Sequence, residues 1–489
     1  MNSSGLNNRC LALALLSITL LLFSLQRVIW AQATTSTSDR VRSNVISVKR
    51  DAVTPLYGTK TASTEGDISR QNGDFLKWQG RGQLTWNISV PASGDYEVQI
   101  CYAAPTAASG TVVDVARGNS RISVRFEGTK GYFGSPYVDY ERVVLPGKVK
   151  LVAGQQVIVM RIEDPKAEPA MHFRSLELVP VHAKPALEAE HEKARKSRAS
   201  TEWLAKAGYG VMFHWTSQTV AQDGTRKSYA EAVRNFDVDA FVEMVSSMGA
   251  AYVLFTVGHA EPYCPAPIKA WQKYHPGMTI QRDLIMEMAD KLNAKGIKLM
   301  CYFPTHVVAK AFRGDDQEFE QINREVMTEF GERYGRKIVG YWFDGWYQSF
   351  ERHPNVSFED FFHACKAGNP DRIIALNSWI YPKLTEWQEY WAGEVASPVA
   401  PPKDQYFDYG PATGLQYQAL LIMEPYWVQE KAEMPDPRFS AEKLSEYIRA
   451  CMLHGGAVTV NLGIYQDGRV GTKALEIMRE VRKLVRGKP

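Results

Sequence analysis

The sequence predicts two domains of different classes, an all-β sandwich of the jelly-roll type followed by a (β/α)₈ barrel of the α/β class. Its 489 residues exceed what one hydrophobic core usually supports. Residues 45–182 contain short runs of alternating apolar side chains separated by turn residues. From residue 202 to residue 489, apolar runs alternate instead with amphipathic helical segments, which is typical of repeated βα units. Between them, the charged stretch 183–201 predicts a solvated helical linker.

The first 33 residues predict a secretory signal peptide. Arg9 precedes an apolar run from Leu11 to Leu25, and Ala31-Gln32-Ala33 is a small-residue cleavage site. The run is shorter than the roughly 20 residues that a membrane-spanning helix needs, so we expect cleavage and no stable membrane anchor; an uncleaved anchor is the alternative. The mature protein is therefore expected to be secreted or periplasmic.

Composition excludes few classes of function. A formal net charge of +3 gives no reason to expect a nucleic-acid partner. Once Cys10 is removed with the signal, five cysteines remain, and their odd number and wide spacing indicate neither a disulfide framework nor paired zinc ligands. We therefore expect no metal site and no cofactor.

The predicted sandwich is clearest where two strands, 83–90 and 96–100, flank the turn Pro91-Ala92-Ser93-Gly94. The layout of this region resembles carbohydrate-binding modules of the galactose-binding-like fold. The resemblance implies a sugar-binding domain, with Trp78 and Trp86 as aromatic candidates. A structural appendage, with both tryptophans in its core, is the other interpretation.

Eight strands are expected in the barrel. They cover residues 209–214, 251–257, 298–303, 338–343, 373–377, 390–392, 419–423 and 457–462. Helices are expected over 238–247, 282–294, 318–333, 358–366, 441–453 and 473–485. An open doubly wound sheet is the alternative, but no glycine-rich nucleotide fingerprint follows any strand. A (β/α)₈ barrel carries its catalytic groups at the carboxyl ends of its strands.

Polar and aromatic residues recur at these strand ends. They are His214, Trp215, His259, Glu261, Tyr302, Trp342, Asp344, Asn377, Trp379, Glu394, Glu424 and Asn461. Each residue alone is weak evidence for a site, since a lone aspartate, for example, often caps a helix. Their recurrence in strand after strand predicts a single pocket. Carboxylates flanked by Trp, His and Tyr, without a metal-ligand or Ser/Cys nucleophile motif, indicate glycoside hydrolysis.

At these residues the sequence resembles the α-L-fucosidases of glycoside hydrolase family 29, from about residue 203 to residue 485. The matching segments are Gly210–Trp215, Tyr252–His259, Tyr341–Gly345 and His454–Gly463. The most specific of them is Tyr341-Trp342-Phe343-Asp344-Gly345, which fits the family's nucleophile strand.

The resemblance implies a retaining exo-glycosidase that releases L-fucose from a fucosylated glycan. Asp344 is the implied nucleophile, and Glu394 is the implied acid/base, with Glu261 and Glu424 as alternatives. The implied substrate contacts are His214, Trp215, His259, Glu261, Tyr302, Trp342, Trp379 and Glu424.

The chain departs from the family pattern at the sugar contacts. The family has two histidines where this chain has His259-Ala260, so one contact to a sugar hydroxyl is missing, and the following aspartate is Glu261. Two alternatives therefore stay open. One is a related glycosidase with a different sugar specificity. The other is a catalytically inactive glycan-binding protein, against which the intact carboxylates of Asp344 and Glu394 count.

Overall fold

The computed structural model describes residues 45–487 except 72–74, 130–139, 311–312, 380, 402 and 407–412. Val45–Pro489 forms one compact unit. The predicted signal peptide, residues 1–33, lies outside the described residues. Within the described part of the chain, no helix has the length and apolarity required to cross a membrane.

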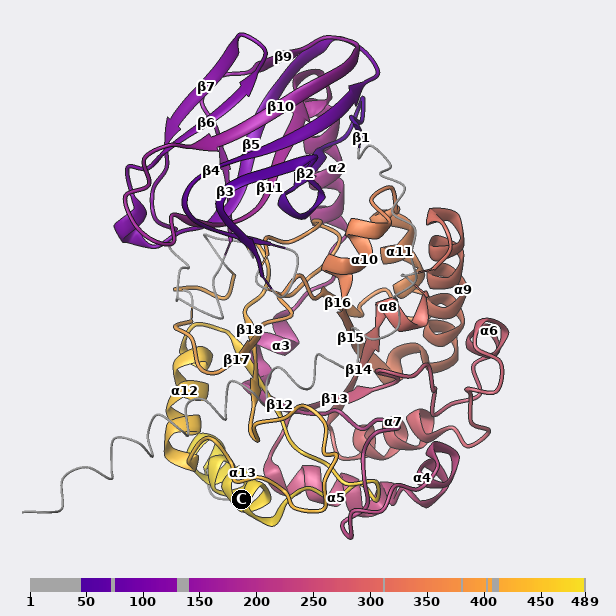
Figure 1. Ribbon diagram of the computed structural model, residues 1–489. Helices are drawn as coiled ribbons and strands as arrows, with labels where there is room; N and C mark the ends of the chain where they lie inside the picture. The colour runs from indigo at the N-terminus through magenta and orange to yellow at the C-terminus, as the bar shows by residue number, and fades with distance from the viewer. Residues whose placement is uncertain are drawn as a thin grey trace, which may run out of the picture. The chain divides into compact units, whose positions relative to one another are not determined.

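The amino-terminal domain is rich in strands (Figure 1). They are β1 (Val45–Ser47), β2 (Thr54–Tyr57), β3 (Ser63–Arg70), β4 (Leu76–Val90), β5 (Gly94–Ala103), β6 (Val112–Arg117), β7 (Ser120–Arg125), β8 (Glu141–Val144), β9 (Val149–Leu151), β10 (Gly154–Ile162) and β11 (Met171–Pro180). The main order is β7-β6-β10-β4-β11-β5-β8, with antiparallel neighbours.

Strand β4 shows why this region folds as a sheet. Its buried residues alternate with half-buried or exposed ones, as expected where one face of a strand meets a core. Trp78 and Trp86 are fully buried on that face, and the Trp86 indole Nε1 donates a hydrogen bond to the carbonyl oxygen of Tyr57 at 3.0 Å. Both tryptophans are therefore core residues, and the expectation that they offer a sugar-binding surface is wrong.

Two helices follow the strand-rich domain, α2 (Lys184–Ser197) and α3 (Glu202–Ala207). In α2 only Ala194 is buried. Its exposed face carries ion pairs such as Arg195 with Glu188 and Lys196 with Glu192. Because α2 has almost no apolar face, it is stabilised mainly by such pairs and by propensity.

The carboxyl-terminal half contains an eight-stranded parallel sheet. Its strands are β12 (Tyr209–Phe213), β13 (Tyr252–Thr256), β14 (Lys298–Pro304), β15 (Ile338–Asp344), β16 (Ile373–Leu376), β17 (Glu394–Ala396), β18 (Gln418–Ile422) and β19 (Ala457–Asn461). The order is β16-β15-β14-β13-β12-β19-β18-β17, and every neighbouring pair is parallel. The result is a parallel half-barrel.

The gap in this sheet lies between β16 and β17, which no ladder joins within the described residues. The backbone N–H groups of Glu389 and Tyr390 donate to the carbonyl oxygen of Ile374 at 2.9 and 3.4 Å. Tyr390 also forms an isolated bridge with Gln416. The strand expected at 390–392 is thus displaced to Glu394–Ala396, after the bend at Gly393, whose φ is +64°.

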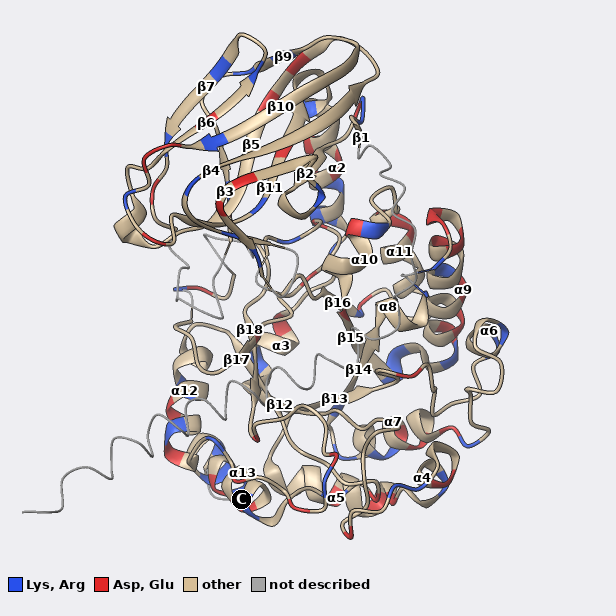
Figure 2. Cartoon of the chain, viewed as in Figure 1, with Lys and Arg blue, Asp and Glu red and all other residues tan. Residues whose placement is uncertain are grey.

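Helices lie outside the parallel sheet (Figure 1). They are α4 (Tyr229–Asn235), α5 (Val238–Met248), α6 (Lys269–Tyr274), α7 (Leu284–Ala294), α8 (Thr305–Val308), α9 (Asp316–Tyr334), α10 (Trp346–Arg352), α11 (Phe358–Cys365), α12 (Ala441–Leu453) and α13 (Thr472–Arg486). Helices α5, α7 and α9 begin after Asp237, Asp283 and Asp315, whose carboxylates each accept a backbone N–H of the first turn. Figure 2 shows charged residues along α9, α12 and α13.

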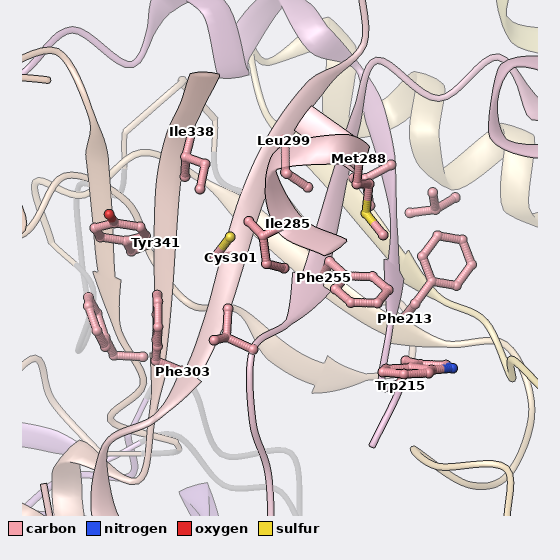
Figure 3. Close-up of a cluster of buried hydrophobic side chains, with 14 of the residues drawn as sticks. Phe213, Trp215, Phe255, Ile285, Met288, Leu299, Cys301, Phe303, Ile338 and Tyr341 are labelled. Atoms are coloured by element: carbon pink, nitrogen blue, oxygen red, sulfur yellow. The ribbon is translucent and has the colours of Figure 1, made fainter. Parts of the chain in front are cut away.

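The two faces of the parallel strands have different roles because successive side chains point to opposite faces. One face packs against the helices and supplies Phe213, Phe255, Phe303 and Tyr341 to the larger hydrophobic core (Figure 3). The other face holds a smaller cluster that includes Met212, Leu254, Tyr302 and Trp342. The residues of this second face that lie at the strand ends form the candidate site.

Candidate active site

Two carboxylates meet at one side-chain amide. Asp344 ends β15, Glu394 begins β17, and Asn377 directly follows β16. The Asn377 Nδ2 atom donates to Asp344 Oδ1 at 2.9 Å and to Glu394 Oε2 at 2.7 Å. The distance between these two oxygens cannot exceed the combined length of the two hydrogen bonds. That limit is close to the separation of about 5–5.5 Å that retaining glycosidases use.

The environment of Asp344 favours its ionised form. Tyr302 Oη donates to Asp344 Oδ2 at 2.7 Å, and the backbone N–H of Gly345 donates to Oδ1 at 2.8 Å. Burial alone would raise the pKa of Asp344, but His306, the hydrogen bonds from Tyr302 and Asn377, and His259 together lower it. Asp344 is thus a carboxylate with three hydrogen-bond donors.

Tyr302 is held in place by Trp342, its register partner on the neighbouring strand β15. The two rings stack with centroids 5.2 Å apart and planes 18° apart, and Trp342 Nε1 donates to the carbonyl oxygen of Ala392 at 2.8 Å. Burial raises the pKa of Tyr302 well above its usual value, and Asp344 adds to that effect, so the phenol keeps its proton and remains a donor. Trp342 is only 2 % exposed. Trp342 shares this face of the sheet with Tyr302, which is buried to the same degree, so its contact with substrate stays a prediction.

Two histidines stand beside Tyr302. The His214 ring lies 5.4 Å from that of His259, 5.1 Å from Tyr302 and 5.0 Å from Trp427. Burial lowers the pKa of His214 to about 3 and that of His259 to about 4. Both imidazoles are therefore neutral near pH 7.

The tautomer of His214 follows from Asn461. The Asn461 Nδ2 atom donates to the carbonyl oxygen of Trp427 at 3.2 Å, which leaves its Oδ1 to accept from His214 Nδ1 at 2.8 Å. A neutral imidazole with its proton on Nδ1 has an acceptor at Nε2. His214 can thus accept a hydrogen bond from a hydroxyl group.

Glu424 lies just beyond the end of β18. Its Oε2 accepts from the backbone N–H of Gly463 at 2.8 Å, and its buried Oε1 has no hydrogen-bond partner among the described residues. Burial raises the pKa of Glu424 to about 7. A raised pKa is what a general acid needs, so this geometry keeps Glu424 open as the alternative to Glu394.

Three other predicted residues have different surroundings. Trp215 is 1 % exposed, donates from Nε1 to the carbonyl oxygen of Gln466, and stacks on Phe255 in the larger core (Figure 3). It is one residue past His214 and faces the helices, so the expected substrate contact is wrong. Glu261 is exposed and accepts from the Ser217 hydroxyl. Trp379 is half-buried, and its backbone N–H donates to Asn377 Oδ1 at 2.9 Å.

Sequence reasoning assigned no role to Asn377 or His306, although both act on Asp344. Asn377 was recognisable as a polar strand end, but nothing in the sequence indicates that its amide bridges two carboxylates. His306 lies on the short helix α8, past the end of β14, where no periodic pattern marks it. Within the described ranges, no group of three or more His, Cys, Asp or Glu side chains could hold a metal ion.

Comparisons with known proteins place this chain in a family. The family model for alpha-L-fucosidase matches residues 230–486, which is more than half of the chain. A search of curated proteins found no match.

Three solved structures are similar to part of the chain. The endo-fucoidan hydrolase P5AFcnA of glycoside hydrolase family 107 has 16% identity and a TM-score of 0.43 over 57% of this chain and 91% of that one. The alpha-L-fucosidase AlfC from Lactobacillus casei has 16% identity and a TM-score of 0.42 over 58% and 97%. A bacterial fucosidase bound to an inhibitor has 16% identity and a TM-score of 0.44 over 59% and 75%. By the family match, this chain belongs to the alpha-L-fucosidase family and is a glycoside hydrolase.

Proposed function

We propose that this protein is a secreted, retaining exo-α-L-fucosidase that releases L-fucose from fucosylated glycans. The observation that carries the proposal is the Asn377 amide, which bridges Asp344 and Glu394 and so limits their separation to a range that suits a double-displacement pair. The family match supports the sugar.

In the first step, an Asp344 oxygen attacks the anomeric carbon of the fucoside while Glu394 gives its proton to the departing glycosidic oxygen. A fucosyl ester on Asp344 forms as the glycosidic bond breaks. In the second step, Glu394 takes a proton from water as that water attacks the anomeric carbon, and Asp344 leaves as a carboxylate. The lowered pKa of Asp344 suits both its attack and its departure.

Sugar recognition is assigned to the neutral imidazoles and Tyr302. His214 offers an acceptor at Nε2, and His259 Nδ1 is buried without a hydrogen-bond partner among the described residues. An unmet buried polar atom beside the carboxylates fits a hydroxyl of the bound sugar. Trp379, half-buried next to Asn377, is the proposed aromatic contact at the rim.

We extend the proposal to the fold and location. The bonds from Glu389 and Tyr390 to Ile374 favour closure of the eight strands into a (β/α)₈ barrel. The strand-rich domain is proposed to be a jelly-roll sandwich; the burial of Trp78 and Trp86 gives sugar binding by it no support. Secretion rests on the signal-like residues 1–33 alone.

One second function stays a candidate, a glycosidase of the same mechanism with another sugar. It is favoured by Ala260, which leaves one expected sugar contact empty. A panel of aryl glycosides separates the two, since only the first proposal requires that the α-L-fucoside be the best substrate.

The mechanism is tested with an aryl α-L-fucoside, the Asp344→Ala and Glu394→Ala variants, and azide. Azide should restore turnover in Asp344→Ala with a β-L-fucosyl azide product, because it attacks in place of the nucleophile. In Glu394→Ala it should give the α-L-fucosyl azide, because it attacks the ester that Asp344 still forms. The Glu202→Ala variant is the control for an exposed carboxylate and should retain wild-type turnover. A wild-type enzyme no faster than Asp344→Ala would refute the proposed activity, and an azide rescue in Glu424→Ala but not in Glu394→Ala would reassign the acid/base.

A further inference from the structure

The strand-rich domain contacts the parallel half-barrel through a buried arginine. Arg174 lies on β11, and its side chain is only 5% exposed. Its Nη2 atom forms an ion pair with Glu351 Oε1, a side chain that is itself only 10% exposed. The Arg174 Cζ atom also lies 3.5 Å from the centroid of the Tyr381 ring. A buried guanidinium depends on such partners, since removal of one leaves an uncompensated charge.

Glu351 places Arg174 next to the candidate nucleophile in the fold. It lies on α10, a seven-residue helix that starts two residues after Asp344. Two lysines of the strand-rich domain hold the same end of the helix. Lys60 Nζ donates to the carbonyl oxygen of Glu351 at 3.0 Å, and Lys49 Nζ donates to that of Pro354 at 2.6 Å. Lys60 thus supplies a donor to one of the last carbonyl groups of α10, and Lys49 bonds the chain just beyond the helix, so three basic residues of one domain contact this end of α10.

Tyr381 connects Arg174 to the bridging amide. The Tyr381 ring packs against Trp379 and Tyr347 of the half-barrel, with centroids 5.8 Å apart in both cases. Tyr140 of the strand-rich domain also packs against the Tyr381 ring, with centroids 5.0 Å apart. Together with Phe75, these side chains form one interdomain hydrophobic cluster.

The backbone of Trp379 is strained and therefore depends on this packing. Its φ is +53°, a left-handed conformation that is rare for a bulky residue and costs about 1–3 kcal/mol unless the surroundings impose it. In this conformation the Trp379 N–H donates to Asn377 Oδ1. That bond fixes which way the Asn377 amide points, and so it aims Nδ2 at Asp344 and Glu394.

We propose that Arg174 is a positioning residue of the active site: through Glu351 and Tyr381 it holds α10 and the Trp379 turn, and thereby keeps Asn377 between the two carboxylates. The strand-rich domain is accordingly part of the catalytic apparatus. The inference rests on the proposed function for the roles of Asp344 and Glu394, but the structural coupling it describes does not depend on the identity of the sugar.

Arg174→Met is the test variant, with Arg142→Met as its matched control. Arg142 lies on β8 of the same domain and pairs with Glu177 of β11, at 2.6 and 3.3 Å, so its ion pair stays within the strand-rich domain. Both variants break an ion pair to a nearly buried glutamate. Only Arg174→Met removes a contact to α10 and Tyr381. An effect of lost stability should therefore appear in both variants, whereas an effect of lost positioning should appear in Arg174→Met alone.

Kinetics with an aryl α-L-fucoside provide the first measurement. We expect kcat of Arg174→Met to fall about 10- to 100-fold with KM within about twofold of wild type, because misplacement of a reacting group lowers the rate of the chemical step. Arg142→Met should keep the wild-type kcat, and Arg174→Lys should recover part of the loss. Equal kcat values for Arg174→Met and Arg142→Met would overturn the proposal.

Hydrogen–deuterium exchange provides a second measurement that needs no substrate. In Arg174→Met, the exchange of residues 345–353 and 377–382 should accelerate, while in Arg142→Met it should match wild type. If Arg174→Met fails to fold, the same comparison is made with Arg174→Lys. Unchanged exchange in both segments would overturn the coupling even in an active enzyme, whereas faster exchange in a protein with no fucosidase activity would overturn the proposed function and leave the coupling standing.

Discussion

Replacement of Asn377 by aspartate is the sharpest test of the bridged carboxylate pair. Aspartate has the shape of asparagine and keeps an oxygen to accept the Trp379 N–H, so the turn is preserved. The change replaces one atom, Nδ2, by an oxygen that faces Asp344 at 2.9 Å and Glu394 at 2.7 Å. A donor shared by two carboxylates becomes a third carboxylate between them.

The magnitude follows from these distances. Two like charges 4 Å apart repel by about 4 kcal/mol at an effective dielectric constant of about 20, and the repulsion is larger at the distances found here. Since one pKa unit corresponds to about 1.4 kcal/mol, at least one of the three carboxyl groups should keep its proton near pH 7. The Asn377→Ala variant lacks the repulsion and loses only the charge-assisted hydrogen bonds, a cost of about 1.5–3 kcal/mol.

The assay is kcat/KM for an aryl α-L-fucoside from pH 4 to pH 9 in both variants. Asn377→Ala should lose about 10- to 100-fold, the rate equivalent of its lost hydrogen bonds. Asn377→Asp should lose at least about a thousandfold at neutral pH and recover part of its activity toward acid pH, where the introduced carboxyl group is protonated and again donates a hydrogen bond. Circular dichroism confirms that both variants fold. Neutral-pH activity of Asn377→Asp equal to or above that of Asn377→Ala would refute the bridging role.

Three further predictions concern single side chains. Tyr302→Phe removes the 2.7 Å hydrogen bond that stabilises ionised Asp344, so the pKa of Asp344 should rise. The acid limb of the kcat/KM profile should then move to higher pH. An unmoved limb would contradict the role of Asp344 as the nucleophile. The pKa of Glu424 is about 7 in the folded protein and about 4.5 in the unfolded chain. Between these values only the folded state holds the proton, so the free energy of unfolding should fall by up to about 3 kcal/mol as pH rises from 4.5 past 7. Urea titrations at several pH values should show this slope in the wild type and not in Glu424→Gln. Trp215→Ala should destabilise the fold by about 3–5 kcal/mol as a core cavity does, while the folded variant keeps the wild-type KM; a KM that rises at least tenfold would restore Trp215 as a substrate contact.

The parallel strands were the most predictable part of the fold, because a strand buried on both faces is a continuous apolar run. Tyr252–Thr256 and Ala457–Asn461 are buried throughout, and the sequence marks both by their composition alone. Strand β17 has three residues and only one fully buried, so its apolar signal is too short to locate it. The preceding run at 390–392 is more apolar, but its residues make a single bridge before the chain bends at Gly393.

Different physical properties decide which site residues the sequence can predict. His214, Tyr302 and Asp344 share a face because parallel strands in register bring their carboxyl ends to one level, as the pairing of Pro304 with Asp344 illustrates. A strand-end pattern is enough to find them. The face that a side chain occupies is a separate matter: Trp215 alternates onto the helix side, whereas Trp342 lies level with Tyr302 on the opposite face. Only the register and the packing of neighbouring rings show that Trp215, unlike Trp342, belongs to the core on the helix side.

The gap in the parallel sheet explains why the bridge depends on a side chain. Asp344 and Asn377 are held level by the β15–β16 ladder, in which Phe343 pairs with Leu376. Glu394 belongs to the β17–β18 pair, and no ladder within the described residues connects that pair to β16. The Asn377–Glu394 hydrogen bond therefore joins β16 and β17 beyond the two backbone bonds from Glu389 and Tyr390 to Ile374, at a level where no strand ladder connects them. Since no strand register sets the distance between the two carboxylates, we expect this amide and the residues that aim it to contribute to that distance. That is why changes at Asn377, and at Arg174 behind it, should affect turnover more than their distance from the sugar suggests.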